Sequence, residues 1–137
     1  MPLNEEGMNL TERLTMYFDR SNAFETLWSF YLTVVLGLLS FSGGGKKTTV
    51  GVAVFLIIAF LVFAVASLKA LLVVTHQRWQ LQTLIGKVAT TNDEKAIAGT
   101  IDTSTVSQVV AFHLLGDVLA MAGIWFFALS RSANACP

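Results

Sequence analysis

The chain has 137 residues, of which 54% are hydrophobic and only 13% are charged, and its formal net charge is zero. This composition is typical of a membrane protein. A neutral chain without a basic patch is not expected to bind nucleic acid. The single cysteine, Cys136, has no partner for an intramolecular disulfide and no neighbouring ligands for zinc. We therefore expect no metal and no cofactor.

The first predicted element is a short amphipathic helix over residues 9–20. Asn9 and Glu12 have the spacing of a capping box. Beyond them the apolar residues share one helical face: Leu10, Leu14, Tyr17 and Phe18. Such a helix is expected to lie at the membrane surface.

Three long apolar segments follow, at 23–41, 50–74 and 106–129. A hydrocarbon core of roughly 30 Å needs about 20 apolar residues per spanning helix, so we predict three transmembrane helices. Asn22 and Glu25 are placed to cap the first of them.

The second spanning helix is expected to continue outside the membrane to about residue 89, because apolar residues keep helical spacing there. The linker 75–105 then contains a further short helix over NDEKAIAG, and Asp102, Thr103 or Ser104 can cap the third span. The predicted fold class is an all-α integral membrane protein, with residues 1–137 forming a single membrane domain. It has three transmembrane helices, an interfacial N-terminal helix and a cytosolic extension of the second span.

With three spans, the N-terminus and the 75–105 linker share one side of the membrane. That side carries Arg13, Arg20, Arg78, Lys87 and Lys95, whereas the other side carries Lys46, Lys47 and Arg131. The excess of positive charge predicts a cytoplasmic N-terminus, and we expect a multi-pass protein of the bacterial inner membrane.

Ionisable residues within spanning segments are costly and commonly mark functional positions. Four of them fall in the same half of the predicted membrane: Glu25, Lys69, His113 and Asp117. We expect Asp117 to pair with Lys69 and to accept a hydrogen bond from His113, which would fix the register of the helices. Alternatively, Lys69 extends to the headgroups and leaves Asp117 protonated, or His113 and Asp117 form a proton or ion relay.

Each predicted span also has a face of small or polar residues at helical spacing, and we expect the three faces to meet. On the first span this face is Glu25, Ser29, Thr33 and Gly37; on the second it is Ala59, Val62, Ala66, Lys69 and His76; on the third it is His113, Gly116, Asp117, Ala120, Gly123 and Ile124. Small residues allow close approach of helices, so four positions are predicted to pack tightly: Gly37, Gly116, Ala120 and Gly123. On the third span, bulky residues point the opposite way: Leu115, Val118, Leu119 and Phe126.

Two histidines, His76 and His113, lie on adjacent predicted helices, which raises the question of haem. In length and number of spans the chain resembles the small membrane anchor subunits of quinone-linked dehydrogenases, in which helix histidines can hold a b-type haem. The resemblance covers only size and span count, with no sequence motif of that family. Because the two histidines differ in depth by more than one turn, we do not expect haem.

No catalytic motif such as GxSxG or HExxH is present, and the SGGGKKTT loop lacks the spacing of a phosphate-binding loop. We therefore expect a non-enzymatic membrane protein, acting as a structural or accessory subunit of a larger membrane complex or a homo-oligomer. The alternative is a homo-oligomeric proton or ion channel or transporter using Lys69, His113 and Asp117. A holin-like pore ranks third, because the chain lacks a strongly basic C-terminal tail.

Overall fold

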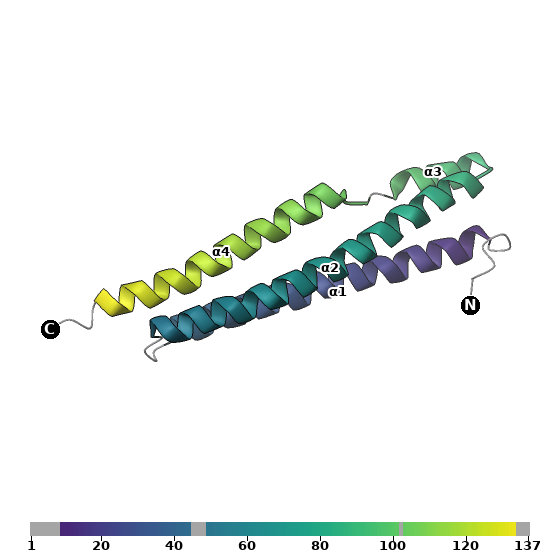
Figure 1. Cartoon of the computed structure of the whole chain (residues 1–137). Helices are drawn as coiled ribbons and strands as arrows, with labels where there is room; N and C mark the ends of the chain where they lie inside the picture. The colour runs from purple at the N-terminus through teal and green to yellow at the C-terminus, as the bar shows by residue number, and fades with distance from the viewer. Residues whose placement is uncertain (1–8, 45–48, 102, 134–137) are drawn as a thin grey trace.

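The computed structural model describes residues 9–44, 49–101 and 103–133, with side chains as far as residue 130. These residues form four α-helices (Figure 1): α1 (Leu10–Gly43), α2 (Val50–Val88), α3 (Asn92–Thr100) and α4 (Val106–Ala133). Three of them, α1, α2 and α4, are long and apolar enough to cross a membrane. The predicted all-helical class with three such helices is confirmed, whereas Lys46, Lys47, Asp102 and Cys136 lie outside the described residues.

Helix α1 replaces two predicted helices with one. It runs without a break for 34 residues, or about 51 Å at 1.5 Å per residue. Asn9 caps it in a capping box, in which the Asn9 side chain accepts from the Glu12 backbone N–H at 2.9 Å. Asn22 caps nothing, since its backbone carbonyl accepts from Thr26 Oγ1 as an interior helical residue. No proline or glycine interrupts residues 10–36, so the helix propagates through the predicted boundary.

Helix α2 is also longer than a bilayer core, with 39 residues spanning about 58 Å. It begins after the N-cap Thr49 and ends at Val88, close to the predicted end. Helix α4 is capped by Thr105 rather than by Thr103 or Ser104. The Thr105 hydroxyl accepts from the backbone N–H of Gln108, and the Gln108 side chain accepts from the backbone N–H of Thr105.

α1 and α2 form a helical hairpin, and α4 runs lengthwise alongside it (Figure 1). α1 and α2 lie side by side and antiparallel, α4 contacts both of them, and α3 folds back against the far end of α2 (Figure 1). The central buried cluster contains Tyr31, Phe60, Ala64 and Ala120. A second cluster lies toward the α1–α2 turn: Ala53, Ile124 and Ala128.

A third buried cluster lies beyond the predicted spans, where α1 and α2 extend together. It contains Tyr17, Leu81 and Ile85, with Ala98 of α3 packed against it. The guanidinium of Arg78 is buried here, 4.8 Å from the Phe24 ring centroid and 5.5 Å from that of Tyr17. Arg78 also donates a hydrogen bond of 3.3 Å to the Tyr17 hydroxyl. The amphipathic segment at 9–20 is therefore packed against the α2 extension as a continuation of α1.

Helix α3 provides a prediction about pH. One oxygen of Glu94, Oε2, accepts from the backbone N–H groups of Thr90 and Thr91 at 2.8 and 2.9 Å. These hydrogen bonds favour the ionised carboxylate and lower the pKa of Glu94 from 4.5 to about 2. Because the folded pKa is the lower one, Glu94 stabilises this helix end above pH 4.5, and the stabilisation is lost as the pH falls toward 2.

We therefore expect the Glu94 carboxyl to titrate near pH 2 in a carbon-detected NMR titration. The exposed Asp93 carboxyl on the same helix serves as an internal comparison for the solvent conditions. A Glu94 midpoint near 4.5 would show that the capping box is not formed in solution.

Candidate functional site

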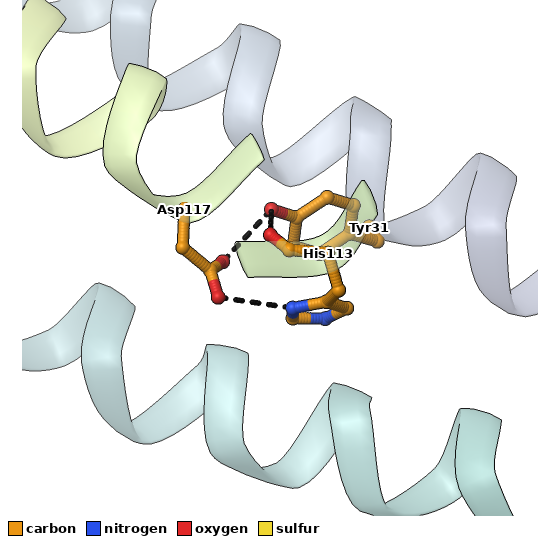
Figure 2. A network of polar contacts seen from close by, with 3 residues as sticks. All are labelled: Tyr31, His113 and Asp117. Atoms are coloured by element: carbon orange, nitrogen blue, oxygen red, sulfur yellow. Dashed lines mark hydrogen bonds and ion pairs between the residues drawn. The ribbon is translucent and has the colours of Figure 1, made fainter. Parts of the chain in front are cut away.

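Three side chains form a buried polar cluster between α1 and α4: Tyr31, His113 and Asp117 (Figure 2). The Tyr31 hydroxyl donates to Asp117 Oδ1 at 2.8 Å. His113 Nδ1 lies 2.9 Å from Asp117 Oδ2. The carboxyl group of Asp117 therefore joins the tyrosine of one helix to the histidine of another, and its two oxygens have separate partners.

The local sequence explains why these groups meet. His113 and Asp117 are four residues apart on α4, so their side chains lie one above the other on the same face. Tyr31 reaches them from α1 because Gly116 leaves the necessary space: a Cβ at that position would lie 2.7 Å from the Tyr31 hydroxyl oxygen. Gly116 thus admits the phenol that partners Asp117.

Aromatic rings enclose the cluster. The Tyr31 ring centroid lies 4.4 Å from that of His113, and Phe63 stacks on Tyr31 at 6.2 Å with an interplanar angle of 8°. Trp28 meets Tyr31 edge to face at 5.7 Å. His113 is 0% exposed and Asp117 is 8% exposed. In such an apolar enclosure each hydrogen bond is stronger than in water, and an unpaired polar atom is costly.

One polar atom of the cluster is left over. His113 Nε2 is buried and has no hydrogen-bond partner among the described residues. With Nδ1–H donating to an ionised Asp117, Nε2 carries an unused lone pair; with a protonated ring, it carries an unused N–H. The cluster can therefore hold its two helices together, and within the described structure one buried nitrogen of His113 takes no part in that contact.

Lys69 is not part of this cluster. Its side chain is exposed on α2, and in the described structure no ion pair joins it to Asp117. The expected Lys69–Asp117 pair is therefore replaced by the pair of Asp117 with His113 and by the hydroxyl of Tyr31. Glu25 is also exposed and lies in the interior of α1, so it does not cap a helix. Among the described residues no ion pair joins it to Lys69, His113 or Asp117.

Of the three faces of small or polar residues that were predicted to point inward, one is buried and two are exposed. On α4 the expected inner face is observed, since His113, Asp117, Ala120 and Ile124 are buried, and the residues expected to point away are exposed: Leu115, Val118, Leu119 and Phe126. The faces predicted for the other two helices are wrong, because their members are exposed: Glu25, Ser29, Thr33 and Gly37 on α1, and Ala59, Val62, Ala66, Lys69 and His76 on α2.

Thr33 shows why a polar residue on an apolar helix does not have to face protein. Its hydroxyl donates to the backbone carbonyl of Ser29 at 2.8 Å, which satisfies it within its own helix. A Cβ at Gly37 would have no described atom within 4 Å, so Gly37 makes no close helix contact in this part of the chain. By contrast, a Cβ at Gly123 would lie 2.6 Å from Leu39 Cδ2, which places Gly123 at a close approach of α4 to α1.

The two histidines are not arranged as a pair. His76 is exposed, lies 3.0 Å from the side-chain nitrogen of Gln80, and stacks on Trp79 with ring centroids 6.3 Å apart. His113 is buried and uses Nδ1 on Asp117. Within the described part of the chain, no group of three potential metal ligands occurs.

Comparisons with known proteins add no family to this geometry. No protein-family model matches the chain, and no curated protein or solved structure is significantly similar to it. Its function is therefore inferred from the site itself. Sequence reasoning missed Tyr31, the third member of the cluster, although a phenol within an apolar helix usually needs a hydrogen-bond partner when it is buried.

Proposed function

We propose that the chain is a multi-pass membrane protein that serves as a structural or accessory subunit of a membrane assembly. α1, α2 and α4 cross the membrane, and the polar cluster of Tyr31, His113 and Asp117 fixes how α4 sits on α1. The main support for this proposal is the buried hydrogen bond of 2.8 Å between Tyr31 of α1 and Asp117 of α4. A polar group used in this way sets helix register and is consistent with a non-enzymatic role.

The outer surface supports a role in assembly. Lys69 and Glu25 are exposed at membrane-facing positions of α2 and α1, where a charge must reach the headgroups or meet a protein partner. Several large aromatic residues also point outward: Phe30, Phe55, Phe112 and Phe126. Lipid accepts such residues, and so does the apolar surface of a partner subunit.

We also propose a cytoplasmic N-terminus. Residues 10–22 of α1, the end of α2 and α3 together form the extension outside the membrane, and the basic residues of this part favour the cytoplasmic side. A bacterial inner membrane would accommodate this arrangement. The apolar cluster around Tyr17, Leu81 and Ile85 would then be a small cytosolic projection.

The test is the mass of the native assembly after mild detergent extraction, with its protein components identified by mass spectrometry. We expect this chain to be recovered with larger subunits, or as a defined homo-oligomer, at a fixed stoichiometry. Recovery as a monomer from native membranes, at every detergent concentration that keeps it folded, would contradict the proposal.

A second function, proton or ion translocation by a homo-oligomer, is favoured by a separate observation. His113 Nε2 is buried without a partner in the described structure, and Asp117 lines an apolar groove of about 190 Å³ between α2 and α4. A titratable pair that reaches a groove can exchange protons if a second copy supplies the rest of a pathway.

This second function predicts proton flux in liposomes containing the purified protein. Asp117→Asn should abolish the flux, whereas Asp19→Asn, at an exposed position of α1 away from the cluster, should leave it unchanged. Wild-type liposomes that are no leakier than empty ones would exclude translocation and leave the structural role in place.

A further inference from the structure

A groove of about 610 Å³ runs along the outer surface between α1 and α4. Its polar end is formed by Ser104 and Gln108, and its far end by Leu115 and Leu119. Gln108 and Leu119 are separated by 11 residues of helix, or about 16 Å. That length is close to half of a hydrocarbon core of roughly 30 Å, the depth of one lipid leaflet.

The walls of the groove are apolar and largely aromatic. α1 contributes Phe24 and Trp28, and α4 contributes Phe112. The floor includes Tyr31 and Gly116, so the groove lies directly over the polar cluster. Aliphatic and aromatic walls of this kind suit a hydrocarbon chain, and only the end near Gln108 offers hydrogen-bonding groups.

An acidic side chain lies beside the polar end. Glu25, Trp28 and Leu32 are spaced i, i+3 and i+7 on α1, and the latter two line the groove, so helical geometry places the exposed Glu25 at its edge. Arg78 does not line the groove, because its buried guanidinium packs on the rings of Phe24 and Tyr17 and donates to the Tyr17 hydroxyl. The charge next to the groove is therefore negative.

We propose that this groove binds one zwitterionic phospholipid with a primary ammonium headgroup. An acyl chain fills the apolar part, and the headgroup lies at the polar end, where its ammonium group donates to Glu25 and to the side-chain oxygen of Gln108. An anionic headgroup is disfavoured by the Glu25 carboxylate, and a trimethylated headgroup has no N–H to donate. The inference rests on the proposed membrane location, but it is independent of what the chain assembles with.

The experiment uses the full chain reconstituted into bilayers with equal amounts of phosphatidylethanolamine, phosphatidylcholine and phosphatidylglycerol. Retained lipids are identified by native mass spectrometry after transfer to mild detergent. The charge-assisted hydrogen bonds of the ammonium group are made by only one of the three headgroups. We therefore expect one phosphatidylethanolamine per chain, enriched about tenfold over each competitor, which corresponds to about 1.4 kcal/mol.

Two matched pairs of variants locate the site. Glu25→Gln should remove the preference for the ammonium headgroup, whereas Asp19→Asn, another exposed carboxylate of α1, should keep it. Leu115→Trp, at a half-exposed position in the groove wall, should lower total lipid retention. Leu129→Trp, at a similarly exposed position elsewhere on α4, should not.

Equal retention of the three lipids would overturn the proposal, as would retention that is unchanged in both Glu25→Gln and Leu115→Trp. The proposal would also be overturned if Leu115→Trp removed a bound protein chain from the spectrum and left the amount of retained lipid unchanged. The same spectra report the subunits present, so a failure of the lipid site is read separately from a failure of the assembly role.

Discussion

Replacing Asp117 with leucine should lower the free energy of unfolding by about 3 kcal/mol, because it leaves His113 Nδ1 without a partner and the Tyr31 hydroxyl with only its longer bond, of 3.4 Å, to the His113 backbone carbonyl. The Tyr31 hydroxyl and His113 Nδ1 both bond to Asp117, at 2.8 and 2.9 Å. Each unsatisfied buried polar group costs about 1–3 kcal/mol. Interhelical hydrogen bonds in membranes average only about 0.6 kcal/mol in double-mutant cycles. The expected destabilisation is therefore toward the lower end of the cost of two such groups added together.

The measurement is reversible unfolding in mixed micelles, followed by tryptophan fluorescence. Trp28 is a suitable reporter because its ring centroid lies 6.0 Å from that of His113. Lys69→Leu is the control: it removes an ionisable residue from an apolar helix but touches no member of the cluster, so it should not destabilise the fold. A loss in Lys69→Leu as large as that in Asp117→Leu would indicate that Asp117 pairs with Lys69 in solution.

A double-mutant cycle with Tyr31→Phe isolates the contact between the two helices. Tyr31→Phe removes only the hydroxyl, and its effect should shrink by about 1 kcal/mol when Asp117 is already leucine. If the effects of the two substitutions on the free energy of unfolding were additive, the two side chains would not be bonded. The proposed role of this hydrogen bond in holding α4 against α1 would then be wrong.

The long helices could be predicted from the sequence because apolar length determines them. α2 illustrates this, since its apolar run and its continued helical spacing predicted both the apolar helix and the extension that ends at Val88. The helix boundary predicted at Asn22 is wrong, because α1 continues through this residue. The sequence pattern of a helix cap can also occur inside a helix, so the pattern alone does not show that a helix begins there. Continued packing of the 10–22 segment against α2 favours the unbroken helix.

The site was predicted in part for a similar reason. His113 and Asp117 share one helix, so their separation follows from helical geometry alone. Tyr31 and Lys69 lie on other helices, and their positions depend on how those helices rotate about their axes. The small and hydroxyl-bearing residues of α1 suggested an inward face that is in fact exposed, because Thr33 satisfies its hydroxyl locally and lipid tolerates the rest.

The second large effect is expected at two glycines. Replacing Gly116 with alanine should lower the free energy of unfolding, whereas replacing Gly37 with alanine should raise it. Gly116→Ala places a methyl group 2.7 Å from the Tyr31 hydroxyl oxygen. The tyrosine cannot easily move aside, because its ring is packed against His113 and Phe63. Overpacking of this kind costs about 1–3 kcal/mol, and displacement of the hydroxyl also weakens its bond to Asp117.

Gly37→Ala should instead stabilise the protein, by about 0.5–1 kcal/mol, because alanine favours helix and no described atom lies within 4 Å of the added methyl. Unfolding of both variants under the conditions used for Asp117→Leu gives the comparison. Gly123→Ala should fall between them, since the group it meets is the terminal methyl of Leu39, which can rotate away. If Gly37→Ala were destabilising while Gly116→Ala was neutral, α1 would present its other face to α4. The Tyr31–Asp117 contact would then be absent in the folded protein.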